Sequence, residues 1–149
     1  MSERQSDKYV VGVDVGTGSA RAGLFDANGG RLATASHPIA MWRPQPDWAE
    51  QSSTDIWDAI RLCVRECLSQ AQIAASKVVG ISFDATCSLV VLDANGDGLP
   101  INTDGDKTRD VIVWMDHRAI PETEEINAEY SNMWAARCHP KCKRRSCFG

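Results

Sequence analysis

No stretch of this sequence is apolar for long enough to cross a bilayer, and its start, MSERQSDKYV, is too polar for a secretory signal. We therefore expect a cytoplasmic protein without a membrane span. The six cysteines do not form a regular pattern either, because Cys63 and Cys67 lie one helical turn apart, Cys87 stands alone and the other three lie at Cys138 or later. Such a spread is not that of a secreted disulfide framework.

Acidic residues are missing from the end of the chain. The last seventeen residues, MWAARCHPKCKRRSCFG, hold five basic residues and no acidic one, whereas the whole chain has a net charge of −4. The body is therefore acidic and the tail basic, which indicates two different compositions joined near residue 130. At 149 residues the chain is long enough for one domain with its own core.

The first half of the chain has a clear order of predicted elements. Strands are expected at residues 9–15, 20–26 and about 31–38, the last two joined by DANGG, whose Asn-Gly pair favours a hairpin turn. Ser52, with Asp55 three residues later, resembles a capping box and opens a helix predicted to run to about Ala75. Apolar residues recur at helical spacing along that segment, so one face of the helix should be buried.

The second half adds apolar strands and a short helix. VVGISFD (78–84) is a nearly continuous apolar run, expected to be buried, and SLVVLD (88–93) and DVIVWM (110–115) are two further apolar segments. RAIPETEEINAE then predicts a short helix. Three hairpin strands, a long helix and a further strand together predict an α/β domain with a mixed sheet.

The stretch DVGTGSARAGLFD has the composition of a loop that holds phosphate. A tight turn of Gly16, Thr17, Gly18 and Ser19 exposes backbone N–H groups, and its small residues allow phosphate oxygens to come close. Asp14, at the end of the preceding strand, is a candidate ligand for Mg²⁺. Arg21, just after the turn, could reach a transferring phosphate. The alternative is a plain hairpin with a solvated aspartate and arginine.

Four stretches in this order resemble the N-terminal domain of the FGGY carbohydrate kinases, within the actin-like ATPase superfamily. They are DVGTGSARAGLFD, PDWAEQSSTDIW, GISFDATCSLVVLD and VWMDHRA, and they cover roughly residues 9 to 128. FDATCS and WMDHRA are most similar to kinases of the D-ribulokinase type, including ribitol kinases. The resemblance implies a ribonuclease-H-like domain that is the N-terminal half of a two-domain kinase. Residues 1–8 are expected to be disordered.

The resemblance also implies the ligands and the residues that contact them. ATP with Mg²⁺ would be held by the glycine turn, Arg21 and Asp14, and a terminal hydroxyl of a pentulose such as D-ribulose, or of ribitol, would be phosphorylated. The substrate-binding candidates are Asp84, Ala85, Thr86, Cys87, Trp114, Asp116 and His117. Other interpretations stay open, since Trp114 could be a core residue, Asp116 a helix cap and His117 a surface residue.

Parts of such a kinase have no candidate in this sequence. The resemblance places the catalytic aspartate, a second phosphate loop and the adenosine pocket after the end of this chain. A cleft with one wall cannot exclude water or align two substrates. We therefore expect the polypeptide alone to be inert and to need a C-terminal kinase domain, and for the full-length protein a homodimer stays open.

The tail from residue 129 has an explanation in the coding frame. Read one frame out, EYSNMWAARCHPKCKRRSCFG can become VLQYVGGAMSPEMQTPKLLW, which resembles what pentulose kinases carry after the WMDHRA segment. A frameshift would make residues 129–149 an out-of-frame, disordered segment. The rival interpretations are a zinc site at Cys138, His139, Cys142 and Cys147, whose spacing matches no common pattern, and a nucleic-acid or lipid contact through its basic run. No nucleic-acid partner is expected.

Three functions are therefore compared. The first is the N-terminal part of an ATP-dependent pentulose kinase. The second is a non-enzymatic binding module that uses the half-domain and the basic tail. The third is a member of another branch of the actin-like superfamily that shares only the hairpin.

Overall fold

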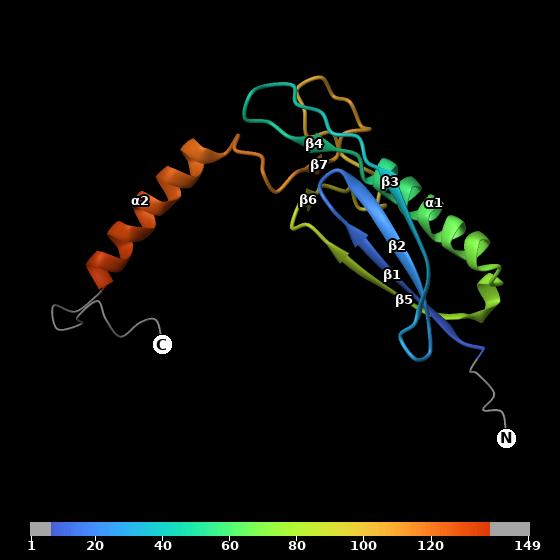
Figure 1. The fold of residues 1–149 in the computed structure, drawn as a ribbon. Coiled ribbons are helices and arrows are strands. Elements are labelled where there is room, and N and C mark those ends of the chain that lie inside the picture. The colour runs from blue at the N-terminus through green and yellow to red at the C-terminus, as the bar shows by residue number, and fades with distance from the viewer. Residues whose placement is uncertain (1–6, 138–149) are drawn as a thin grey trace. The chain divides into compact units, whose positions relative to one another are not determined.

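The computed structural model describes residues 7–137 of the chain and divides it into two compact units. The first unit ends at Asp116 and the second begins at His117. Figure 1 shows the elements of both units, and each unit is treated by itself below. In the described range, no helix is both long and apolar enough to cross a membrane.

The first unit is built on a mixed four-stranded sheet in the order β3-β2-β1-β5. Its strands are β1 (Tyr9–Val15), β2 (Ser19–Asp26), β3 (Arg31–Pro38) and β5 (Val78–Ala85). β1 pairs antiparallel with β2 and β2 with β3, whereas β1 and β5 run parallel. The three predicted hairpin strands and the mixed sheet are confirmed, and Gly29 takes a positive φ of 81° in the DANGG turn.

Helix α1 (Ser53–Ala71) covers one face of this sheet (Figure 1). It begins as predicted, because the Ser52 side chain accepts a hydrogen bond from the backbone N–H of Asp55. It ends at Ala71 rather than near Ala75, because Gln72 turns into the left-handed conformation and its N–H closes the last turn. A short 3₁₀ turn, Ala75–Lys77, then leads into β5.

The core lies between α1 and the strands β1, β2 and β3. Alternate valines of β1 and the fully buried Leu24 of β2 pack against Ile60 and two cysteines of α1. Burial raises the pKa of both Cys63 and Cys67, so these thiols stay protonated, and they donate to the carbonyls of Ala20 and Ala22. Both cysteines are therefore packing residues of the core.

A second, three-stranded sheet lies beside the ends of the first, in the order β4-β7-β6. Its strands are β4 (Glu50–Gln51), β7 (Val111–Ile112) and β6 (Leu89–Val90), and both pairings are antiparallel. Residues 88–93 were predicted as a strand and 110–115 as an apolar segment, and only two residues of each belong to this ladder. Backbone hydrogen bonds, first from the N–H of Asp97 and second from that of Asn95, lower the pKa of the Asp93 carboxylate. These hydrogen bonds close a turn in the segment between β6 and β7.

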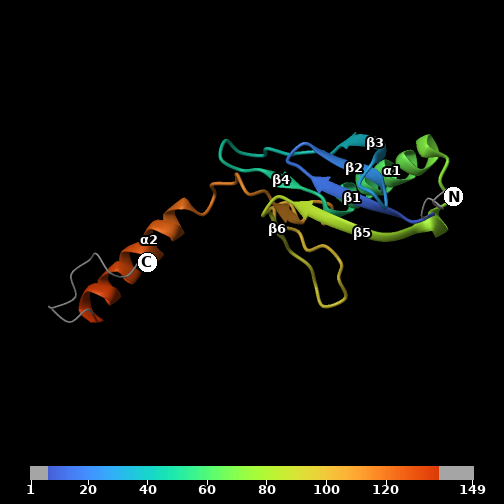
Figure 2. The same cartoon turned by 60° about the horizontal axis from the view of Figure 1, so that its bottom comes forward.

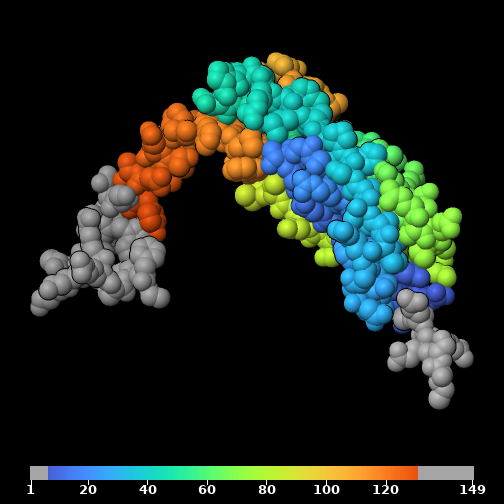
Figure 3. Space-filling model, viewed as in Figure 1, coloured from blue at the N-terminus to red at the C-terminus, as the bar shows by residue number. Residues whose placement is uncertain are grey.

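β5 differs from the prediction in its burial. Residues Val79 to Ala85 are all exposed, with Val79 61% and Phe83 48% exposed, although the run was expected to be buried. The physical reason is its position, because β5 pairs with β1 alone among the strands described and α1 lies over the other three strands. Figure 2 shows β5 at the edge of the sheet, and Figure 3 shows its yellow-green atoms open to view. An edge-to-face contact between the rings of Trp57 of α1 and Phe83 covers part of β5, with ring centroids 5.8 Å apart.

The second unit contains helix α2 (Ile120–Arg137). The short helix predicted from RAIPETEEINAE ends at Glu129, so the structure extends it by eight residues. The added sequence, YSNMWAAR, contains no glycine or proline to stop a helix. Residues 138–149 of the tail, with all the proposed zinc ligands, and residues 1–6 lie outside the described residues.

Candidate functional site

The turn between β1 and β2, Gly16–Ser19, is held by donors to three successive carbonyls. The N–H of Gly16 donates to the Ser19 carbonyl at 3.0 Å and closes the turn. The N–H of Ile39 donates to the Gly18 carbonyl at 3.0 Å, and the side-chain amide of Gln51 donates to the Thr17 carbonyl at 2.7 Å. The carbonyls of Thr17 and Gly18 are therefore hydrogen-bonded to other segments of the protein, and that of Ser19 is hydrogen-bonded within the turn. We call Gly16–Ser19 the glycine turn.

The N–H groups of the glycine turn are not used in the same way. Among residues 7–137, those of Thr17 and Gly18 donate to no protein acceptor. Gly18 is exposed, and a Cβ added to it would meet no atom within 4 Å. An incoming anion can therefore approach this backbone closely and receive two hydrogen bonds from it. The turn has the donors and the space that a phosphate group requires.

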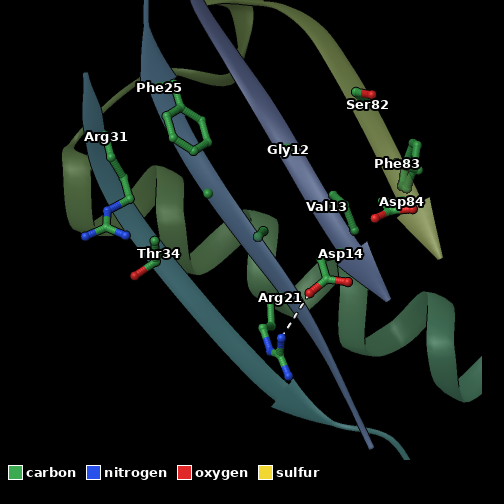
Figure 4. Close-up of a pocket in the computed structure, with 12 residues that line it drawn as sticks. Gly12, Val13, Asp14, Arg21, Phe25, Arg31, Thr34, Ser82, Phe83 and Asp84 are labelled. Atoms are coloured by element: carbon green, nitrogen blue, oxygen red, sulfur yellow. Dashed lines mark hydrogen bonds and ion pairs between the residues drawn. The ribbon is translucent and has the colours of Figure 1, made fainter. Parts of the chain in front are cut away.

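Asp14 of β1 and Arg21 of β2 are directly opposite each other in the β1–β2 pairing, next to the glycine turn that joins the two strands. The Arg21 guanidinium donates to one carboxylate oxygen of Asp14 at 3.0 Å, and both side chains are at least half exposed. Their pair lies along one wall of a depression of about 400 Å³ on the sheet face opposite α1 (Figure 4). Glycines of the strands form the floor of the depression, and the Phe25 ring lies at the end away from this pair.

Asp84 brings a second carboxylate to the same depression. The parallel register places Asp84 of β5 beside Asp14 of β1, and Figure 4 shows both side chains at one end of the depression. Within residues 7–137 no three metal-ligating side chains gather into a cage. One or two carboxylates are nevertheless the usual protein share of a Mg²⁺ site, since water and phosphate oxygens complete its shell. The donor set at Asp14 therefore fits a magnesium ion that arrives with a phosphate ligand.

A run of side chains connects the end of β5 to the glycine turn. The hydroxyls of Thr86 and Ser88 are 3.1 Å apart, and the Ser88 hydroxyl accepts a hydrogen bond from the Trp114 N–H at 3.2 Å. The indole N–H of Trp114 then donates to the Thr17 hydroxyl at 3.1 Å. About half of Trp114 is exposed, so it is not a core residue, and the predicted phosphate and substrate residues are joined through it.

The remaining predicted residues have more varied positions. Ala85 ends β5 opposite Val15, and the exposed Cys87 follows it. A carboxylate oxygen of Asp116 accepts the N–H of Ala49 at 2.7 Å, which fastens the segment after β7 to the segment before β4. His117 begins the second unit, where its carbonyl accepts the N–H of Ile120.

Two residues of the site were missed from the sequence. Gln51 is only 2% exposed, and its side-chain amide donates a hydrogen bond to the glycine turn. The Ser88 hydroxyl accepts a hydrogen bond from the backbone N–H of Trp114. Ser88 is the last residue of the quoted segment FDATCS, so the segment was identified from the sequence although the residue was not named as a site residue. No local signal distinguishes Gln51 from a surface glutamine, because its role depends on a contact 34 residues away.

A family model described as the FGGY family of carbohydrate kinases, N-terminal domain, matches residues 9–137. The FGGY carbohydrate kinase domain-containing protein of Homo sapiens is 47% identical over 125 residues, which is 84% of this chain and 22% of that protein. The D-ribulokinase YDR109C of Saccharomyces cerevisiae is 46% identical over 123 residues, 81% of this chain and 17% of that protein. The chain thus spans about a fifth of the length of these curated relatives.

A solved structure agrees with the sequence comparisons. The xylulose kinase from Rhodospirillum rubrum matches with a TM-score of 0.69 and 30% identity, over 82% of this chain and 23% of that chain. The expected actin-like fold and the position of this chain in the N-terminal half of a kinase are thereby confirmed.

Proposed function

This chain belongs to the FGGY family of carbohydrate kinases, and from that premise we propose that residues 9–128 form part of an ATP-dependent pentulose kinase. D-ribulose is the first candidate substrate and ribitol the second. The observation that carries the proposal is the glycine turn, in which the carbonyls of Thr17 and Gly18 are hydrogen-bonded to the protein while the N–H groups of the same two residues are left for a phosphate. The likeness to a D-ribulokinase supports the choice of sugar.

The phosphate side of the site would work mainly by positioning and by charge. Thr17 and Gly18 would donate to phosphate oxygens of ATP, and Asp14 would hold Mg²⁺, which neutralises the charge of the phosphates. Arg21 is fixed by Asp14 at 3.0 Å and is half exposed, so it can turn toward a phosphate that binds at this edge. The glycines leave the anion room for close approach.

On the substrate side, we propose that Asp84 accepts hydrogen bonds from two sugar hydroxyls and that Trp114 forms a wall beside them. Thr86, Ala85 and Cys87 would shape this end of the pocket, because they follow Asp84 in the chain. Asp116 would act by fastening the Trp114 segment through Ala49. His117 stays a candidate substrate contact.

A graft tests the proposal, because the 149 residues span only about a fifth of the length of the curated relatives. Residues 9–128 would replace the matching segment of the D-ribulokinase YDR109C, and phosphorylation would be followed with D-ribulose, ribitol, D-xylulose and glycerol. The 149-residue chain itself, assayed beside it, should transfer no phosphate. Turnover of D-ribulose above the other acceptors supports the proposal. A folded graft that binds ATP but phosphorylates none of them contradicts it.

In this graft, we predict that Asp84→Asn raises the KM for the pentulose by about 10- to 100-fold. The reason is that each hydrogen bond to a charged group contributes about 1.5–3 kcal/mol. The KM for ATP should change less than about threefold, because the glycine turn is intact. Asp93→Asn is the matched control, since that carboxylate closes a turn away from the depression. Equal effects on both KM values would show that Asp84 does not contact the sugar.

The exposed β5 supports the view that more kinase chain packs against this unit. Val79→Lys in the 149-residue chain should leave the free energy of unfolding within about 0.5 kcal/mol, because Val79 is 61% exposed. It should reduce self-association, since an exposed, mostly apolar edge strand invites pairing with another chain. Sedimentation velocity would compare it with Gln70→Lys on the exposed side of α1. Equal self-association of both variants would contradict this prediction.

A further inference from the structure

We infer that Gln51 is a positioning residue that fixes the orientation of the Thr17–Gly18 peptide. This inference deepens the proposed function, because it names what keeps the phosphate-binding N–H of Gly18 directed outward. The contact itself is short and buried. The Gln51 amide nitrogen lies 2.7 Å from the Thr17 carbonyl oxygen, and only 2% of Gln51 is exposed.

The geometry of a trans peptide explains why this contact matters for the site. The carbonyl of Thr17 and the N–H of Gly18 belong to one planar peptide group and point in opposite directions. A donor that holds the carbonyl toward the buried side therefore holds the N–H toward solvent. The described residues contain no cis peptide bond, and Gly18 is exposed, so the geometry applies here.

Without this donor, the peptide would have little reason to keep one orientation. A flip of this peptide changes the φ of Gly18, and glycine tolerates both signs of φ. In the flipped form, the Thr17 carbonyl would face the incoming phosphate and repel it. The other hydrogen bond to Thr17, from the Trp114 indole, holds the side chain and leaves the peptide plane free to turn.

Gln51 is itself held by its neighbours, so it can impose this orientation. It lies in β4, where it pairs with Val111 of β7, and it directly precedes Ser52, the cap of α1. A side-chain amide is suited to the task, because it donates a hydrogen bond at any pH. The backbone of Gln51 is thus held by both the second sheet and the start of α1.

The test uses the 149-residue chain, labelled with ¹⁵N, and follows the Thr17 and Gly18 amide signals by NMR. The parent should give one sharp Gly18 signal. Gln51→Met, which keeps the size but loses the donor, should broaden or split it through exchange between two peptide orientations. Ser52→Ala is the control, because it weakens the neighbouring helix cap and leaves the Thr17 contact in place. An unchanged Gly18 signal in Gln51→Met would overturn the inference, as would equal broadening in Ser52→Ala.

A second variant separates this role from simple loss of packing. Gln51→Glu should give one sharp Gly18 signal at low pH, where the carboxylic acid can donate to the Thr17 carbonyl. It should lose that signal as the group ionises, whereas the parent shows no such titration. A pH-independent Gly18 signal in folded Gln51→Glu would also overturn the inference.

Titration of the parent with Mg²⁺-ATP at the same amides keeps the two proposals apart. Shifts at Thr17 and Gly18 that weaken at least tenfold in Gln51→Met support both. If the parent amides do not respond to Mg²⁺-ATP while Gln51→Met still broadens Gly18, the positioning role is supported and the phosphate-binding role of the turn is not.

Discussion

Asp14→Asn in the grafted kinase is expected to lower kcat by about 10²- to 10³-fold, the range measured when one group that stabilises transition-state charge is removed. The carboxylate lies near the end of β1, two residues before Gly16, and one of its oxygens accepts from Arg21 at 3.0 Å. An amide in its place has half the acceptors and no charge. Both a magnesium ligand and the partner that fixes Arg21 would be lost together.

Magnesium dependence distinguishes these two consequences. If Asp14 holds the ion, Asp14→Asn should raise the Mg²⁺ concentration needed for half-maximal rate. If its main task is to fix Arg21, Arg21→Met should reproduce the loss of kcat without changing that concentration. Asp26→Asn is the matched control, because that carboxylate accepts only from turn N–H groups at the far end of β2. A graft whose kcat is the same with Asn at position 14 would exclude both roles.

Much of the fold followed from local patterns in the sequence. The alternating valines of β1, the Asn-Gly turn after β2 and the Ser52 cap each depend on residues a few positions apart, and the structure has all three. The glycine turn was predicted for the same reason, since a phosphate-binding hairpin is a local motif. Its residues could therefore be named from the sequence.

What could not be predicted depends on contacts between distant segments. Gln51 contacts Thr17 across 34 residues and Trp114 contacts it across 97, so neither hydrogen bond leaves a pattern in the sequence. β5 is a case in which a local pattern gave the wrong burial. Its apolar residues predict a buried strand, but burial depends on neighbouring elements. Among the described residues, β5 pairs with another strand, β1, along one edge only.

The link between the second sheet and α1 makes a separate, stability-based prediction. Asp110, just before β7, is 3% exposed and accepts from both the N–H of Ser53 at 2.7 Å and its hydroxyl at 2.5 Å. These donors lie at the first residue of α1, where a carboxylate is also favoured by the helix dipole. Gly98 packs so closely on this carboxylate that an added Cβ would lie 2.6 Å from its oxygen.

Asp110→Ala should therefore reduce the free energy of unfolding of the chain by about 3 kcal/mol, because two partly buried donors lose their acceptor at a helix start. Asp110→Asn keeps one acceptor oxygen and should lose about 1 kcal/mol. Urea unfolding measures both against Asp58→Ala, which breaks only an exposed pair with Arg61 and should change little. Because β7 leads directly to Trp114, Asp110→Ala should also speed solvent exchange of the Trp114 indole N–H. If the variant loses stability but the exchange rate of the Trp114 indole N–H is unchanged, Asp110 stabilises only α1. Asp116 and Ser88 would then suffice to hold the Trp114 segment in place.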